Sequence, residues 1–377
     1  MTFRFIHSAD WHIGKPFRSL PDRLAGELAT ARVDAIGRIA DIARARSASH
    51  VLVAGDIFDG PDIPRVEIRR ALERMAEHSG VQWVLLPGNH DPMRAGGLWD
   101  RVRQLHLPKN IVVLTRPEPL ALAPDVVLLP APVTSNNPGD DPSQWMDTAQ
   151  TQPGVTRIGL AHGSVQGFGT EGDSAVLIAA DRAARAGLDY LALGDWHGTR
   201  SIIANTWYAG TPEPDRFPDN DPGNVLCVTV ERGGKLSVEK VRSSHFTWAK
   251  ISARVQSRED LADIERQIAG VTDTARNLLI KLNLAGSLSL ADHSALDAWR
   301  EVWSARLKLL DVEHGDLVVR PSASDYDQLR GSPALLDVAQ RLTQRVDDAH
   351  SVDREAASLA LVRLYGFAAE SRREAQS

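Results

Sequence analysis

The chain has 377 residues and a formal net charge of −6, and its length allows a sizeable hydrophobic core and more than one domain. The negative charge excludes a general attraction to nucleic acid, so a bound polyanion must be held by local groups. The single cysteine, Cys227, excludes an intramolecular disulfide, and no leader-like or membrane-spanning apolar run is present, so we expect a cytoplasmic location and no membrane insertion.

The first half of the chain predicts strands that alternate with helices. A first apolar strand ends near residue 10, and the segment 20–47 carries apolar residues three or four positions apart, which is typical of an amphipathic helix. The apolar run at 50–56, a helical pattern at 63–79 and the run at 81–91 continue the alternation. Strands that alternate with helices favour a layered α/β fold.

The same alternation resumes after a weaker stretch. Strand signals lie near 111–114 and 125–130, and a strand at 157–163, a helix near 174–186 and a strand at 190–194 follow. The α/β pattern therefore extends over roughly the first 200 residues.

Two features follow the last of these strands. The strands at 224–232 and 235–242 flank a Gly-Gly pair, which predicts a hairpin. The loop 211–223 is rich in proline and acidic residues, and we expect it to be an ordered excursion beside the site.

The pattern changes near residue 245, which suggests further domains. We predict an α/β domain over 1–243, a small α+β domain over 244–330 and a helical segment over 331–377. Apolar residues line one side of the last segment, so it is expected to dock on the core or on a partner.

Five apolar strands end in polar residues that can bind metal. These residues are Asp10, His12, Asp56, Asn89, His90, His162, Asp195 and His197. Ligands of open α/β sheets gather beyond the carboxyl ends of the strands, so we expect these side chains to converge. Each i, i+2 pair aims both of its side chains to one side of an extended segment.

These residue types predict a particular metal chemistry. Carboxylates, imidazoles and one amide, without a thiolate, suit manganese, iron or zinc. Their number fits two ions that share one carboxylate and stabilise both oxygens of an in-line displacement at phosphorus, with a metal-activated hydroxide as nucleophile. Glycine before Asp56, Asn89 and Asp195 fits a tight turn that lets substrate approach the backbone.

Taken in order, the five motifs resemble the calcineurin-like metallophosphoesterase superfamily. The stretches "FIHSADWHIGKPF" and "AGDIFD" are most similar to its SbcD-type DNA repair exonuclease branch, the nuclease subunit. The resemblance covers roughly the first 240 residues. It implies a four-layer α/β/β/α sandwich, with the small α+β domain as a cap that grades substrates.

The resemblance also implies roles for individual residues. One ion would be held by Asp10, His12 and His197, a second by Asn89 and His162, and Asp56 would bridge them. His90 would act as general acid or stabilise the transition state, and Asp91 would orient His90. Manganese is the usual ion of the family.

Position 195 departs from the pattern of the branch, which generally has histidine there. As a ligand of the second ion, Asp195 is expected to make that ion a weaker Lewis acid that prefers manganese over zinc and attracts phosphate less strongly. If Asp195 is not a ligand, the second site is weak or empty.

Four cations shortly after the catalytic segments are candidates for gripping a phosphodiester backbone: Lys15, Arg18, Arg94 and Arg216. The leading hypothesis is a manganese-dependent DNA exonuclease or endonuclease of repair. The resemblance implies that it works with an SbcC-type SMC-like ATPase and as a homodimer. The alternatives are a phosphoesterase acting on nucleotides or small phosphodiesters, and a DNA- or ATPase-binding scaffold with an impaired second metal site.

Overall fold

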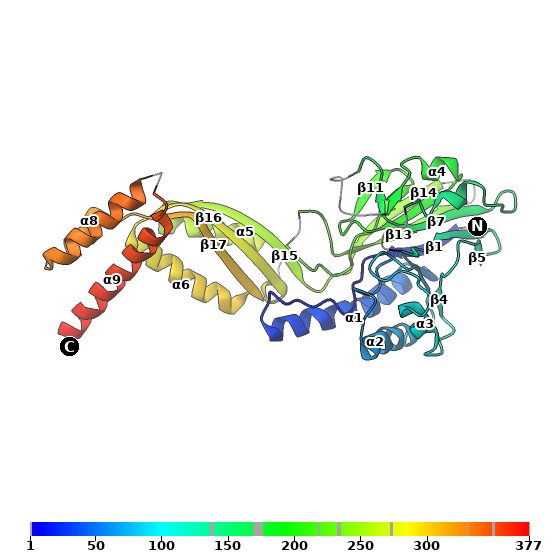
Figure 1. Ribbon diagram of the computed structural model, residues 1–377, viewed down its shortest axis with the longest axis horizontal. Coiled ribbons are helices and arrows are strands. Elements are labelled where there is room, and N and C mark those ends of the chain that lie inside the picture. The colour runs from blue at the N-terminus through cyan, green and yellow to red at the C-terminus, as the bar shows by residue number, and fades with distance from the viewer. Residues whose placement is uncertain are drawn as a thin grey trace. The chain divides into compact units, whose positions relative to one another are not determined.

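The computed structural model describes most of the chain. The described residues are 2–135, 139–168, 176–217, 219–231, 235–271, 274–329, 331–348 and 351–376. They form two compact units, Met1–Phe246 and Thr247–Ser377 (Figure 1). Whether the second unit acts as a cap for the first stays a prediction.

The first unit contains two mixed six-stranded sheets. One has the order β14-β13-β1-β2-β3-β4 and the other the order β11-β12-β10-β7-β6-β5. The strands of the first sheet are β1 (Thr2–Ser8), β2 (His50–Val53), β3 (Gln82–Leu85), β4 (Ile111–Val113), β13 (Asn224–Glu231) and β14 (Lys235–Arg242). The strands of the second are β5 (Leu120–Ala123), β6 (Val126–Ala131), β7 (Thr156–His162), β10 (Tyr190–Gly194), β11 (Arg200–Ile203) and β12 (Thr206–Tyr208).

Within each sheet, the strands that lead to predicted ligands run parallel. β1 pairs in parallel with β2, and β2 pairs with β3. In the other sheet, β7 pairs in parallel with β10. β13 pairs antiparallel with β1 and with β14, and the predicted Gly-Gly turn between β13 and β14 lies outside the described residues.

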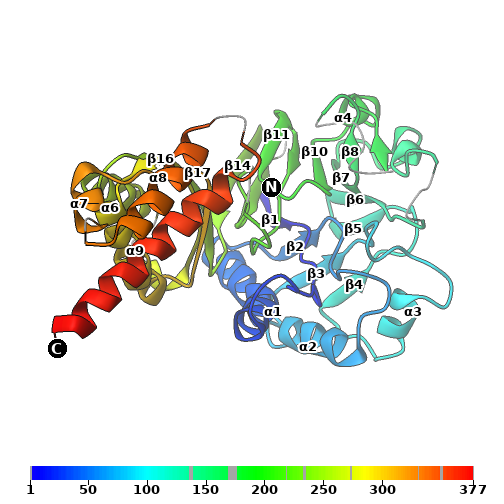
Figure 2. The same cartoon turned by 60° about the vertical axis from the view of Figure 1, so that its left-hand side comes forward.

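Side-chain alternation along the strands separates the layers of this unit. Ile6 packs in a core with Ile36 of α1 (Asp22–Ala45) and Ile68 of α2 (Arg65–Ala76), whereas Phe5 packs in a core shared with Leu160 of the other sheet. Figure 2 shows α1 and α2 along the side of the first sheet that faces away from the second sheet. The helix α3 (Leu98–Arg103) joins the same outer layer through Trp99.

Short elements cover the face of the second sheet that is turned away from the first sheet. Its core includes Leu193 of β10, Ala183 of α4 (Arg182–Arg185) and Met146 of the 3-10 turn Gln144–Asp147. The two sheets therefore lie between helical layers, and the predicted four-layer α/β/β/α arrangement is confirmed.

One predicted helix, near 174–186, is wrong in extent. The described part holds the short strand β9 (Leu177–Ile178), which pairs with β8 (Ser164–Val165), and the single turn α4. Arg182 is buried and forms ion pairs with Asp141 and Asp147, so contacts distant in sequence determine the conformation of this segment. Such contacts override a local helical preference.

The second unit has a parallel three-stranded sheet and helices. The strands are β15 (Thr247–Val255), β16 (Leu278–Leu288) and β17 (Leu309–Val319). The helices are α5 (Leu261–Val271), α6 (Leu290–Arg306), α7 (Ala323–Leu329), α8 (Pro333–Asp347) and α9 (Arg354–Gln376), with 3-10 turns at Arg258–Asp260 and Ala275–Asn277. The predicted helical C-terminal region is therefore present.

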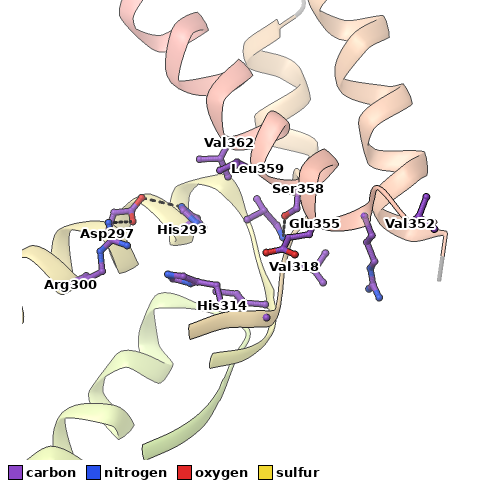
Figure 3. Close-up of a pocket in the computed structure, with 14 residues that line it drawn as sticks. His293, Asp297, Arg300, His314, Val318, Val352, Glu355, Ser358, Leu359 and Val362 are labelled. Atoms are coloured by element: carbon purple, nitrogen blue, oxygen red, sulfur yellow. Dashed lines mark hydrogen bonds and ion pairs between the residues drawn. The ribbon is translucent and has the colours of Figure 1, made fainter. Parts of the chain in front are cut away.

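Two further features of the chain bear on function. A cavity of about 670 Å³ lies in the second unit, among α6, β17 and α9, with His293, His314 and Glu355 in its lining (Figure 3). Of the helices in the described residues, none is both long enough and apolar enough to cross a bilayer.

Candidate metal centre

The loops that carry the predicted ligands meet beyond the ends of five strands of the first unit. The Asp10 amide donates to the Gly55 carbonyl (3.1 Å), which joins the loops after β1 and β2. The Asp195 amide donates to Asp10 Oδ1 (2.9 Å), so the loop after β10 of the second sheet contacts the loop after β1 of the first. Segments far apart in sequence therefore surround one site.

The backbone at this site is strained. Six described residues other than glycine have positive φ, and four of them are predicted ligands: Asp10 (54°), His12 (44°), Asp56 (52°) and Asp195 (104°). L-residues rarely adopt such angles, and functional sites are where this strain concentrates. The fold therefore holds these four side chains at an energetic cost.

Glycines beside the candidate ligands fit the predicted tight turn at Gly55, but the space beside Gly55 and Gly88 has a different occupant from the predicted one. A Cβ at Gly55 would lie 2.2 Å from His162 Nδ1, and a Cβ at Gly88 would lie 2.1 Å from Asp56 Oδ1. Gly55 also has a φ of +89°. The space beside Gly55 and Gly88 is therefore taken by candidate-ligand side chains of the protein, not by an approaching substrate.

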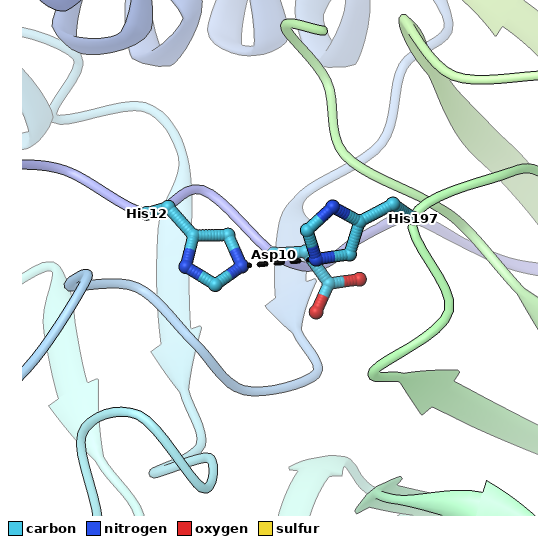
Figure 4. A group of neighbouring side chains, drawn as sticks. All are labelled: Asp10, His12 and His197. Atoms are coloured by element: carbon cyan, nitrogen blue, oxygen red, sulfur yellow. Dashed lines mark hydrogen bonds between the residues drawn. The ribbon is translucent and has the colours of Figure 1, made fainter. Parts of the chain in front are cut away.

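A first group of donors is formed by Asp10, His12 and His197, one ligand atom of each lying within 4.8 Å of the others (Figure 4). His12 Nε2 and His197 Nε2 are 3.1 Å apart. Asp10 is fully buried, and its Oδ2 has no hydrogen-bond partner within the described part of the chain. A cation is one partner that can satisfy a buried carboxylate oxygen of this kind.

A second group surrounds His162 Nε2. This nitrogen lies 2.6 Å from Asn89 Oδ1, 3.4 Å from Asp56 Oδ2 and 3.8 Å from Asp195 Oδ1. The Ser164 hydroxyl donates to Asp195 Oδ2 (2.8 Å), which leaves Oδ1 on the side of His162. Asp195 is thus placed among the donors predicted for the second ion.

Asp56 lies between the two groups. Its Oδ2 is 3.8 Å from His12 Nε2 in the first group and 3.4 Å from His162 Nε2 in the second. The imidazole and carboxylate clusters are therefore compatible with two ions that share Asp56. The donors also fit such ions chemically, because they are oxygen and nitrogen atoms without a thiolate.

The electrostatics of the site depend on burial and on mutual attraction. Burial raises the pKa of Asp10 to about 6 and lowers the pKa of His12 to about 4. Burial also opposes ionisation of Asp56, but the nearby His162 more than offsets it and holds the Asp56 pKa below its usual value. His12 is consequently a neutral imidazole at neutral pH, the form in which histidine binds a metal.

The prediction that Asp91 orients His90 needs correction. The Asp91 carboxylate accepts hydrogen bonds from the backbone amides of Gly88 (2.7 Å) and Phe58 (3.0 Å), and the residue is fully buried. Instead, His90 Nδ1 lies 3.0 Å from the Asp59 carbonyl. Asp91 therefore joins the loops after β2 and β3, because their buried amides need an acceptor.

The predicted substrate cations divide into two pairs. Lys15 and Arg216 line a cavity of about 590 Å³ together with His12, His90 and Asp195. Arg18 and Arg94 are exposed and do not line this cavity. The loop 211–223 supplies much of the cavity wall in its described residues, so the predicted excursion beside the site is confirmed.

Two charged residues at this site were missed in the sequence. Arg32 and Asp215 are buried and form an ion pair with a 3.4 Å separation, and Asp215 also lies 3.7 Å from His197 Nδ1. Burial opposes ionisation of Asp215, but His197, Arg32 and Lys15 hold its pKa far below the usual range. For Arg32, the sequence did contain a signal of burial: the residue lies on the apolar stripe of the predicted helix 20–47, four residues after Leu28.

Comparison with known proteins gives one family. Residues 3–198, just over half of the chain, match the calcineurin-like phosphoesterase family, and this range includes every predicted metal ligand. The curated proteins contain no match. Among solved structures, the chain is similar to TT1561 of Thermus thermophilus, with 13% identity, a TM-score of 0.39 and coverage of 64% of this chain and 100% of that chain.

Proposed function

This chain belongs to the calcineurin-like phosphoesterase family, and from that premise we propose that it is an SbcD-type nuclease that hydrolyses DNA phosphodiester bonds with two manganese ions. The observation that carries the proposal is the position of Asp56 between two groups of histidine and carboxylate donors. Two ions bound there would supply Lewis-acid activation of water and of the phosphate.

The protein's own residues supply the rest of the chemistry. Lys15 and Arg216 line the cavity, where they can bind the phosphate oxygens of the substrate. His90 is exposed at the same cavity, and its Nδ1 faces the Asp59 carbonyl, so Nε2 is the nitrogen that can protonate the leaving oxygen.

Several features of the proposal concern partners and location. DNA would be held by local cations such as Lys15, because the net charge of −6 gives no general attraction. We further propose a homodimer in the cytoplasm that works with an SMC-like ATPase of the SbcC type. The helical region α8–α9 is the segment to which that ATPase would bind.

The proposal is tested with purified protein, manganese and labelled DNA. The chain should degrade DNA, and His90→Ala should lose most of this activity while it binds the same amount of manganese. A manganese-loaded chain that is inert on single-stranded, double-stranded and branched DNA would refute the nuclease proposal.

A second candidate substrate is a nucleotide or a small phosphodiester. The cavity of about 590 Å³ has the size of a small-ligand site, and the net charge of −6 gives no general attraction to a long polyanion. Hydrolysis of bis-p-nitrophenyl phosphate separates either enzyme from a binding scaffold. Competition by DNA in that assay then separates the nuclease from the small-substrate enzyme.

A further inference from the structure

The ring of His197 has two neighbours that compete for Nδ1. Arg216 contacts this nitrogen through its guanidinium (2.8 Å), and Asp215 Oδ1 lies 3.7 Å away. The other ring nitrogen, Nε2, faces His12 Nε2 at 3.1 Å, on the side of the first donor group. Metal ligation by His197 therefore uses Nε2.

Ligation through Nε2 fixes what Nδ1 must do. A neutral imidazole that gives its Nε2 lone pair to a metal carries its proton on Nδ1, and that proton needs an acceptor. Arg216 has only donors, so it cannot be this acceptor. Asp215 is the carboxylate beside the nitrogen, and a displacement of less than about 1 Å brings Oδ1 into hydrogen-bonding distance.

Asp215 is held in place for this task. Lys15 Nζ lies 2.7 Å from Asp215 Oδ2, and Arg32 lies 3.4 Å from the same oxygen. Arg32 also donates to the Trp11 carbonyl (2.5 Å), which lies between the ligands Asp10 and His12. One buried arginine therefore connects the loop that carries Asp10 and His12 with the carboxylate beside His197.

His162 shows this arrangement in complete form, because its Nδ1 lies 2.8 Å from the Ala54 carbonyl. His12 has a carboxylate in the corresponding place: its Nδ1 lies 3.2 Å from Asp59 Oδ1, although it makes no hydrogen bond within the described residues. Both rings present Nε2 to the other donors. His197 fits this pattern only if its acceptor is Asp215.

We propose that Asp215 is the positioning residue of His197: it accepts the Nδ1 proton and so fixes the ring with Nε2 toward the first metal ion. This inference rests on the proposed function, because it requires that the chain binds metal through His197. It also implies that Arg216 leaves Nδ1 when His197 ligates, so that its guanidinium is available to a substrate phosphate.

Nuclear magnetic resonance of the full chain, with ¹⁵N-labelled histidine and zinc as a diamagnetic ion, tests the proposal directly. The expected result is a protonated Nδ1 on His197, with a downfield proton protected from exchange like that of His12. An Asp215→Ala variant, which has no acceptor at this position, should lose this signal and keep that of His12, whereas Asp59→Ala should do the reverse. A His197 proton that exchanges rapidly in the wild-type chain would overturn the proposal even if no variant folds.

Calorimetric titration with manganese provides a second measurement. Asp215→Asn should bind the first ion about 10- to 100-fold more weakly. The control is Glu213→Gln. Glu213 is a buried carboxylate of the loop that carries Asp215, and it pairs with Arg38 of α1, the helix that also carries Arg32. This variant should bind manganese as the wild type does. Equal losses in both variants, or none in Asp215→Asn, would overturn the proposal. A wild-type chain that binds no metal would instead refute the proposed function itself.

Discussion

The strand ends of the first unit that carry the predicted metal ligands, called here the metal-ligand edge, and the cavity of the second unit both gather histidines and carboxylates. The cavity of the second unit is larger than the cavity at the metal-ligand edge, at about 670 Å³ against about 590 Å³. In the second unit, His293 pairs with Asp297 (3.2 Å) one turn along the same helix, where both partners are partly exposed. At the metal-ligand edge, the donors come from five strand ends and are mostly buried.

The two regions also differ in backbone strain. Within the described residues, no residue other than glycine has positive φ in the second unit, whereas four predicted ligands do in the first. Cavity size and residue type therefore do not identify the reactive site. Backbone strain and the buried, unpartnered carboxylate oxygen of Asp10 distinguish the first site, because both cost free energy in the folded chain.

The largest effect is expected from Asp56→Asn, which removes the carboxylate shared by the two groups. Loss of this negative charge should weaken both ions and reduce hydrolysis of bis-p-nitrophenyl phosphate by at least about 10³-fold. Metal content and rates under saturating manganese measure this. A variant that keeps two ions and normal activity would show that the cavity at Asp56 is no more essential for hydrolysis than the cavity of the second unit.

Gly55→Ala tests whether strain at the metal-ligand edge is required. A Cβ at φ +89° and 2.2 Å from His162 Nδ1 should destabilise the chain by about 3 kcal/mol and displace His162. Urea denaturation measures the change. Gly60→Ala is the matched control, since nothing lies within 4 Å of its Cβ, and it should stay within about 0.5 kcal/mol of the wild type. Equal stability of the two variants would contradict the account.

The buried carboxyl of Asp10 predicts a pH dependence of metal binding. Its pKa of about 6 means that the group is protonated at pH 5 and must release a proton to bind an ion. Manganese affinity should therefore fall by about tenfold between pH 7.5 and pH 5. The raised pKa of His162 acts in the same direction. Titrations across this range that give a constant affinity would contradict the assignment of Asp10.

A smaller change is expected from Asp195→His, which removes one negative charge from the second donor group. The ratio of zinc to manganese affinity should rise by about tenfold or less, because imidazole suits zinc better than a carboxylate does. Competition titrations with the two ions measure the ratio. An unchanged ratio would indicate that Asp195 does not bind the second ion.

The smallest effect is expected in the second unit. His293→Gln removes a partly exposed pair within one helix, so stability should change by no more than about 0.5 kcal/mol. Hydrolysis of bis-p-nitrophenyl phosphate should stay within about twofold of the wild type. A loss comparable to that of Asp56→Asn would show that the two cavities had been ranked wrongly.

The sequence predicted the convergence of the candidate ligands better than it predicted their hydrogen-bond partners. An apolar run that ends in a polar pair indicates a strand end, and parallel strands bring such ends to one edge, so the convergence of Asp10, Asp56 and Asn89 could be anticipated. The acceptor that each ring nitrogen meets depends on how loops close. For this reason the contacts of Asp91 with Gly88 and Phe58 could not be derived from spacing.

The same limit applies to secondary structure. Long periodic segments such as α1 were predicted within a few residues, because an apolar stripe is a local property. The segment around α4 was not, since its strand pairing and the ion pairs of Arg182 involve residues distant in sequence. Asp215 was missed for the same reason: its contact with His197 exists only in the folded chain.

Anomalous diffraction from crystals soaked in manganese tests the central claim most directly. The account predicts two ions per chain, about 3.5 to 4 Å apart, with one oxygen or both oxygens of Asp56 bound to both ions. A single ion, two ions that do not share Asp56, or no ion at these residues would contradict it.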